Sequence, residues 1–162
     1  MSIDTVRADL LAQGWTGTIL EFAESSATVE LAAKQAGTEP ARIAKTLAFA
    51  STTDVPGAIL VVAAGDAKVN GGMFKREFRA KPSMLKFDDV EQLTGHPVGG
   101  VCPFANPDDA RVYLDESLRR FATVFPAAGS ANSAVELTIA ELEELSDALG
   151  WVDVCTGWRD EA

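Results

Sequence analysis

The chain has 162 residues, of which 47% are hydrophobic and 23% charged, and its formal net charge is −10. These are ordinary values for one globular domain, so we expect residues 1–162 to form a single domain and exclude a disordered or fibrous chain. The longest apolar run, Ala58–Ala64, is far shorter than the roughly 20 residues of a membrane-spanning helix. The first residues do not resemble a secretory signal, so we expect a soluble, cytoplasmic protein.

Helices and strands alternate in the first half of the chain. Gly14 and Gly37 end two predicted helices, and Ser25 or Ser26 is the expected N-cap of the second. In chain order the pattern predicts a helix over 2–14, a strand over 16–22, a helix ending near 35, a short helical turn over 41–44, and strands over 45–50 and 58–64. The turn segment 53–57 between the last two strands predicts a hairpin, and their apolar runs indicate a central, buried position.

The second half mixes short helices with short strands. Asn70 is the expected cap of one helix, Gly95 ends the next, and Thr138 with Glu141 forms a capping box. In order we predict helices over 72–81 and 88–94, a loop over 96–104, a strand over 111–114, a short helix over 116–121, strands over 124–128 and 134–137, a helix over 139–148 and a strand over 151–155. This order favours a mixed α/β (α+β) fold with a curved, largely antiparallel, barrel-like sheet and helices packed outside. A doubly wound parallel sheet is the alternative, but no glycine-rich turn follows the first strand.

The common catalytic and metal-binding patterns are missing from the sequence. His96 is the only histidine and has no GxSxG context, and neither a P-loop nor GxGxxG occurs. Cys102 and Cys155 form no CxxC pattern, so we expect no metal site and no cofactor. Two free thiols are expected, with a structural disulfide as the alternative.

Lys45 is an unusual charge because it opens an apolar strand. A buried ammonium group is costly unless it reaches water or an anion. One interpretation is a lysine that extends from the strand end to solvent. The other is a cation at the mouth of a pocket, directed at a phosphate or a polarised carbonyl.

Two segments rich in small residues are the next candidates. Gly99–Pro103 contains two glycines that allow close approach of a ligand, and its backbone N–H groups can bind an oxyanion. Gly129–Ala131 is a small-residue segment between two predicted strands. A plain turn is the alternative for both. Cys102 is expected to pack rather than to act as a nucleophile, because nothing near it in sequence would lower the pKa of its thiol.

Basic residues are concentrated in one window of an otherwise acidic chain. From Ala67 to Phe87 there are six basic residues, and Glu77 is the only acidic one. A phosphate-binding patch is one interpretation, and an ordinary solvated helix face is the other.

The motifs RIAKTLAFA, GAILVVAAGDAKVN, LTGHPVGGVCPF and YLDESLRRFATVFPAAGSANSAVELT occur in the order and spacing of a known family. From about Phe22 to Leu145 the chain resembles the YbaK/EbsC family. These are ProX-like, free-standing relatives of the editing domain of bacterial prolyl-tRNA synthetase. The resemblance implies a mixed α/β fold with a curved, barrel-like sheet. It also implies a trans-acting deacylase that removes wrong amino acids from tRNA, with tRNA-Pro as the first candidate.

The same resemblance implies roles for individual residues. Lys45 corresponds to the hallmark lysine of the family, and Gly99, Gly100 and Pro103 belong to its GxxxP loop. Substrate binding is assigned to Phe22, Thr46, Val101, Cys102, Gly129, Ser130 and Ala131, with Phe22 as a wall of the aminoacyl pocket. Contact with the tRNA acceptor end is assigned to Lys68, Lys75, Arg76, Arg79 and Lys81.

Three functions remain open at this stage. The first is a deacylase in which the loop positions a water and Lys45 supplies a cation, without a metal or a side-chain base. The second is a non-catalytic module that binds aminoacyl-tRNA or makes a transient contact with a synthetase. The third is a hydrolase of unrelated small esters.

Overall fold

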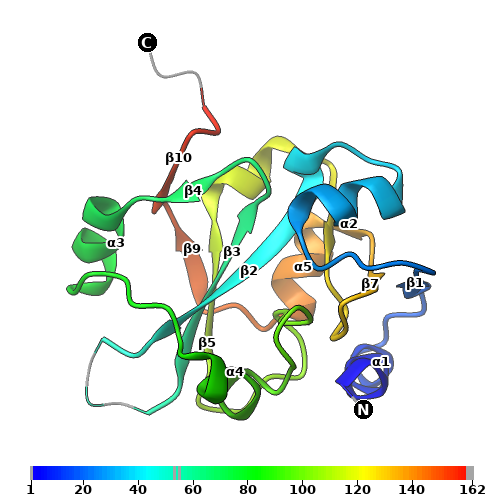
Figure 1. Cartoon of the computed structure of the whole chain (residues 1–162), viewed down its shortest axis with the longest axis horizontal. Helices are drawn as coiled ribbons and strands as arrows, with labels where there is room; N and C mark the ends of the chain where they lie inside the picture. Colours follow the sequence, from blue (N-terminus) through cyan, green and yellow to red (C-terminus); the bar gives the residue numbers. More distant parts are fainter. Residues whose placement is uncertain (1, 53, 55, 160–162) are drawn as a thin grey trace.

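A six-stranded mixed sheet, curled into a half-barrel, forms the centre of the computed structural model, which describes residues 2–52, 54 and 56–159 (Figure 1). The strand order is β8-β6-β2-β3-β5-β9. The strands span Ile43–Ala50 (β2), Ala58–Ala64 (β3), Arg111–Asp115 (β5), Thr123–Pro126 (β6), Leu137–Thr138 (β8) and Gly150–Val152 (β9). The mixed α/β class expected from the sequence is confirmed.

The predicted hairpin is present at the middle of this sheet. β2 and β3 are antiparallel, and Lys45 lies opposite Ala63. Every residue of β3 is buried, as its unbroken apolar run indicated. The predicted turn between the two strands includes Thr53 and Val55, which lie outside the described residues.

Antiparallel pairing is less dominant in the central sheet than the sequence suggested. Two short ribbons are antiparallel, β1 (Leu20–Glu21) with β7 (Ser133–Ala134) and β4 (Lys68–Val69) with β10 (Cys155–Thr156). In the six-stranded sheet, however, β2–β6, β3–β5 and β5–β9 are parallel. Helical connections cause this, because they carry the chain back along the sheet before β5 and β9 begin.

Helices surround the sheet, with α2 and α3 at opposite ends of it in Figure 1. They span Ser2–Ala12 (α1), Val29–Ala36 (α2), Gly71–Phe78 (α3), Phe87–Thr94 (α4) and Ile139–Leu145 (α5), with short 3-10 helices at Pro40–Arg42 (η1) and Glu116–Arg120 (η2). The caps predicted at Asn70, Gly95 and the Thr138–Glu141 box are confirmed.

The predicted cap of α2 is wrong by two or three residues. The Thr28 hydroxyl, rather than Ser25 or Ser26, accepts the helix N–H of Leu31 at 3.2 Å. Both serine hydroxyls donate instead to the carbonyl of Ala131, at 3.4 and 3.3 Å. The Ser25 and Ser26 hydroxyls therefore bond to a segment that is distant in sequence, and not to the N-terminus of α2.

Several predicted strands are shorter than expected. The strand predicted over 16–22 is reduced to β1, because only two residues find a partner in β7. The last predicted strand is divided into β9 and β10 around Asp153 and Val154. The buried carboxylate of Asp115 accepts the Val154 N–H at 2.9 Å and so holds the chain between them.

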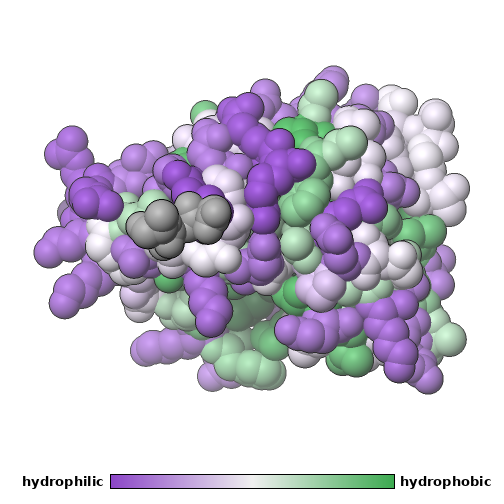
Figure 2. Space-filling model, turned by 90° about the horizontal axis from the view of Figure 1, so that it is seen from above, coloured by the Kyte–Doolittle hydropathy of each residue, from purple (hydrophilic) through white to green (hydrophobic). Residues whose placement is uncertain are grey.

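Hydrophobic side chains fill both sides of the sheet. A row of rings connects Phe49, Phe74, Phe78 and Tyr113, with centroids 4.6 to 5.1 Å apart. Seen from above, hydrophilic residues cover much of the surface, and hydrophobic ones show in a strip near its middle and in groups at its lower and right edges (Figure 2). Among the described helices, none is both long enough and apolar enough to span a membrane.

Candidate functional site

A cavity of about 220 Å³ opens between the start of α2, the start of β2 and two loops. Small side chains dominate its wall, and hydroxyls and one ammonium group are the polar components. The lining residues are Ser26, Ala27, Thr28, Val29, Ala32, Ile43, Ala44, Lys45, Thr46, Gly99, Val101, Phe125, Ala127, Ser133 and Ala134. The cavity therefore brings together Lys45, Thr46, Gly99 and Val101 of the residues predicted from sequence.

Lys45 is half-buried at the start of β2. Its ammonium donates to the carbonyls of Gly65, at 3.4 Å, and Ala67, in the turn between β3 and β4. Burial lowers the pKa of Lys45, and the nearby groups of Cys155 and Asp66 partly oppose this. Lys45 makes no ion pair within the described part of the chain. Its ammonium is hydrogen-bonded only to neutral carbonyls there.

Gly99 and Gly100 have different reasons for being glycine. Gly99 has φ +91°, a conformation that other residues rarely adopt, and it lies next to Ala27 and Ala131. At Gly100 the constraint is contact, because an added Cβ would lie 2.9 Å from the carbonyl oxygen of Gly129. The predicted loop and the predicted small-residue segment are therefore in direct contact.

The N–H groups of the loop differ in availability. Gly100 donates its N–H to the carbonyl of Pro97 at 2.9 Å. The N–H groups of Gly99 and Val101 have no protein acceptor among the described residues, and both residues line the cavity. Two unpaired backbone donors thus belong to residues of the cavity wall, and donors of this kind can bind an oxyanion.

Cys102 and Pro103, at the end of the loop, are not among the described residues that line this cavity. The Cys102 thiol is fully buried, 3.3 Å from His96 Nε2, which itself lies 2.6 Å from the carbonyl oxygen of Phe104. Burial raises the pKa of Cys102 to about 12 and lowers that of His96. Pro103 borders a separate cavity next to α1. The packing role expected for Cys102 agrees with this geometry.

The segment Gly129–Ala131 reaches the cavity mainly through its neighbours. The Ser130 hydroxyl lies 2.6 Å from that of Ser133 and donates to the side-chain oxygen of Asn132 at 3.0 Å. Ser133 lines the cavity. The carbonyl of Ala131 accepts the Ser26 N–H at 2.6 Å and so fixes the entrance to α2.

Phe22 lies beside this segment rather than on the cavity wall. Its N–H donates to the carbonyl of Asn132 at 2.8 Å, and the Asn132 side chain donates back at 3.1 Å. Phe22 is not among the described residues that line the cavity. Phe125, which sequence reasoning did not assign to the site, is the aromatic side chain of the wall.

Thr46 contributes a buried hydroxyl to this region. Its Oγ1 atom is inaccessible to solvent and has no hydrogen-bond partner among the described residues. An unpaired buried hydroxyl is unfavourable, so a ligand gains affinity here only if its binding exposes this atom and supplies a partner.

The five predicted tRNA-binding residues are all exposed and make no ion pair within residues 2–52, 54 and 56–159. Lys68 lies on β4 and is close enough to Lys45 to lower its pKa. Lys75 and Arg76 lie on α3, and Arg79 is its C-cap. Only Lys68 of the group is thus placed near the cavity by a described interaction.

Metal-ligating side chains are not grouped in the described chain. No cluster of three or more His, Cys, Asp or Glu residues there could hold an ion. The polar groups at the cavity are hydroxyls, backbone N–H groups and one ammonium. Such groups can bind a polarised carbonyl oxygen or a phosphate.

The protein is a mixed α/β domain with a half-barrel sheet and a small, partly polar cavity at the start of β2. Residues 23–145 match the family described as aminoacyl-tRNA editing domain, and the chain belongs to that family. Its editing role follows from this membership.

Similar proteins cover nearly the whole chain. A Bacillus subtilis (strain 168) protein, YwhH, described as uncharacterized, is 48% identical over 98% of this chain and 100% of its own length. A structure described as "Crystal structure of a putative trans-editing enzyme for prolyl tRNA synthetase" has 28% identity and a TM-score of 0.85, covering 96% of this chain and 98% of its own. Another, of the hypothetical protein APE2540, has 30% identity and a TM-score of 0.82, covering 94% and 99%.

Proposed function

We propose that this protein is a trans-acting deacylase that hydrolyses the ester between a wrong amino acid and the terminal adenosine of tRNA. The observation that carries the proposal is that Lys45 lines one cavity with Gly99 and Val101, whose N–H groups have no protein acceptor among the described residues. Membership of the aminoacyl-tRNA editing family supports an aminoacyl ester as the substrate. At about 220 Å³ the cavity is smaller than the roughly 300–1,000 Å³ of drug-sized pockets, so it suits an aminoacyl group rather than a nucleotide.

The chemistry needs few protein groups. The oxygen of a water bonds to the ester carbonyl carbon, and negative charge develops on the carbonyl oxygen. The N–H groups of Gly99 and Val101 donate to that oxygen, which stabilises the charge in a partly dry site. The bond to the ribose oxygen then breaks and that oxygen takes a proton of the water, which leaves tRNA and a free amino acid.

Lys45 supplies positive charge at the mouth of the cavity, facing the ester and the terminal phosphate. Lys68 extends this charge along β4, and Lys75, Arg76, Arg79 and Lys81 extend it toward α3 for the acceptor end. The protein works in the cytoplasm, where its tRNA substrate is made, and contacts a synthetase at most transiently. tRNA-Pro is the first candidate, because a similar structure is described as that of "a putative trans-editing enzyme for prolyl tRNA synthetase".

The test is ester loss from tRNA-Pro charged with alanine, cysteine or serine, with and without the purified protein. Lys45→Ala is expected to reduce the rate about 100-fold or more, as for removal of an oxyanion donor in other hydrolases. Lys34→Ala is the matched control, because Lys34 is exposed on α2 and does not line the cavity. Binding without turnover on every charged tRNA would instead identify a binding module. Cleavage of simple esters regardless of tRNA would identify an unrelated hydrolase.

A further inference from the structure

The turn that holds Lys45 is itself held by an arginine from another element. Gly65, Asp66 and Ala67 form this turn between β3 and β4, and Ala67 closes it by donating its N–H to the carbonyl of Ala64 at 3.0 Å. The carbonyls on both sides of Asp66 accept the ammonium of Lys45. The position of that ammonium therefore depends on the position of this turn.

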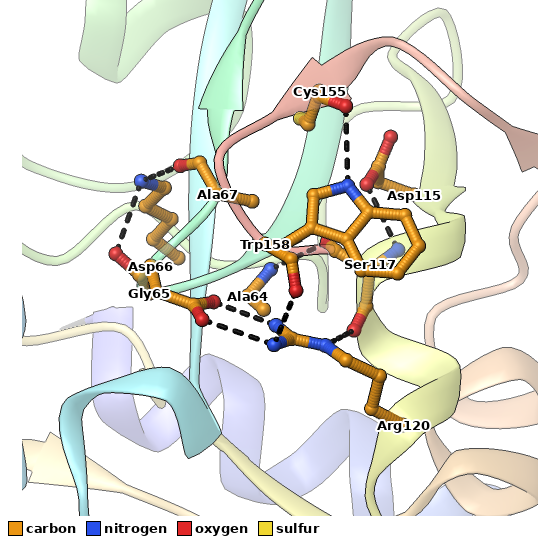
Figure 3. A network of polar contacts seen from close by, with 10 residues as sticks. Ala64, Gly65, Asp66, Ala67, Asp115, Ser117, Arg120, Cys155 and Trp158 are labelled. Carbon is orange, nitrogen blue, oxygen red and sulfur yellow. Dashed lines mark hydrogen bonds and ion pairs between the residues drawn. The ribbon is translucent and has the colours of Figure 1, made fainter. Parts of the chain in front are cut away.

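Arg120, at the end of η2, forms a bidentate ion pair with the carboxylate of Asp66 (Figure 3). Nη2 lies 2.6 Å from Oδ1 and Nη1 lies 3.0 Å from Oδ2. Two further bonds fix the guanidinium: Nε donates to the carbonyl of Ser117 at 2.9 Å, and Nη1 donates to that of Trp158 at 3.0 Å. Arg120 thus joins η2, the turn and the C-terminal segment.

The ion pair between Arg120 and Asp66 matters for Lys45, because Asp66 is one of the charged groups near the Lys45 ammonium. Glu30 from α2, Lys68 from β4, Cys155 from β10 and Asp66 from the turn all act on its ammonium. Asp66 is the acid that lies between the two carbonyls holding the ammonium, and Arg120 keeps the pKa of Asp66 below its usual value. Yet Asp66 pairs with Arg120 and, among the described residues, not with Lys45.

We propose that Arg120 is a positioning residue that occupies both oxygens of Asp66 and so prevents Asp66 from pairing with Lys45. Lys45 then rests on neutral carbonyls and stays available to substrate at the cavity. The importance of that availability for catalysis rests on the function proposed above, whereas the effect of Arg120 on Lys45 does not. The alternative is an ordinary surface ion pair, which contributes little to stability.

The two roles are separated by a double-mutant cycle of Arg120→Gln, Asp66→Asn and the combined variant. Arg119→Gln is the matched control, because Arg119 neighbours Arg120 on η2 but pairs with Glu116 at 2.7 Å. Two quantities are measured in each protein: single-turnover deacylation, and the pKa of Lys45 from NMR of its labelled side chain. Thermal unfolding is recorded to verify that each variant folds.

In Arg120→Gln the released Asp66 carboxylate is expected to pair with Lys45 and raise its pKa by about one unit or more. The deacylation rate is expected to fall about tenfold or more, the factor that corresponds to one such unit. Adding Asp66→Asn removes the competing carboxylate, so both quantities should return close to those of the unchanged protein. Asp66→Asn alone and Arg119→Gln should not raise the pKa of Lys45.

Two results would overturn the proposal. One is an unchanged pKa of Lys45 in Arg120→Gln. The other is a loss of rate in Arg120→Gln that Asp66→Asn does not restore, which would identify Arg120 as a structural residue only. If the unchanged protein shows no deacylation, the proposed function fails, while the pKa measurements still decide the role of Arg120.

Discussion

Gly100 lies so close to Ser130 that a Cβ atom at position 100 would be only 2.8 Å from the Ser130 Cα atom. Real Cβ atoms essentially never approach other atoms that closely, so these two loops can meet only because position 100 is glycine. The contact joins the loop that contributes Gly99 and Val101 to the segment that fixes the start of α2. The shape of the cavity therefore depends on the absence of a Cβ atom at Gly100.

Gly100→Ala is expected to force the two loops apart. The free energy of unfolding should fall by about 1–3 kcal/mol, as for other overpacked interiors, and deacylation should fall with it. Denaturant unfolding and single-turnover rates measure the two effects. Gly71→Ala is the control: nothing lies within 4 Å of a Cβ there and φ is not positive, so stability should stay the same or rise. Equal stability of Gly100→Ala and the unchanged protein would contradict the contact.

Thr46→Val should have opposite effects on the free protein and on its complex with substrate. Removing a buried hydroxyl that has no partner is neutral or stabilising, by about 1 kcal/mol at most. If substrate pairs with that hydroxyl, KM should rise without a matching fall in stability.

Thr38→Val is the matched control for this change, because the Thr38 hydroxyl is also buried and unpaired among the described residues but does not line the cavity. It should match Thr46→Val in thermal unfolding and leave KM unchanged. An equal rise in KM for both variants would count against a substrate contact at Thr46.

Alkaline pH should destabilise the protein through its buried thiols. Burial raises the pKa of Cys102 from 9.0 to about 12 and that of Cys155 to about 12. The unfolded chain therefore loses these protons near pH 9, while the folded protein keeps them until about pH 12. The stabilisation is fully present below pH 9 and is lost between pH 9 and 12, by up to about 1.4 kcal/mol per pH unit for each thiol.

Urea unfolding between pH 8 and 10.5 measures this slope. Cys102→Ala should be less stable at pH 8, since it leaves a gap in the core, but its stability should fall less steeply with pH. A slope identical to that of the unchanged protein would show that Cys102 titrates normally.

The basic face on β4 and α3 should make tRNA binding depend on salt. Replacing Lys75 and Arg76 together by alanine should weaken binding to every tRNA and reduce the slope of log K against log salt by about one unit for each lost phosphate contact. Filter binding across a salt series measures this. Arg7→Ala is the control, because Arg7 is already paired with Asp4 and Glu21, at 3.1 and 3.3 Å. If the double variant keeps the original slope, these residues do not contact tRNA phosphates.

Local patterns were sufficient for the elements whose stability is local. The Asn70 cap and the Thr138–Glu141 capping box were predicted correctly, because neighbours in sequence satisfy their backbone groups. β3 was predicted correctly because its unbroken apolar run is typical of a strand buried on both faces. The caps at Ser25 and Ser26 were wrong and the strand over 16–22 is shorter than predicted, because their partners, Ala131 and β7, lie about 100 residues away in the chain. Parallel pairing of β5 and β9 likewise depends on long connections rather than on local pattern.

By itself, the sequence determined the mixed fold class, the hairpin that contains Lys45 and, through its motifs, the editing family. Only the tertiary structure decided which predicted residues meet: Lys45 and Gly99 line one cavity, whereas Cys102 is buried outside it and Pro103 lines another. It alone brought Arg120 to Asp66 across 54 residues. The physical reason is that hydrogen-bonding capacity and hydrophobicity belong to each residue, whereas burial and charge pairing depend on what the folded chain places beside it.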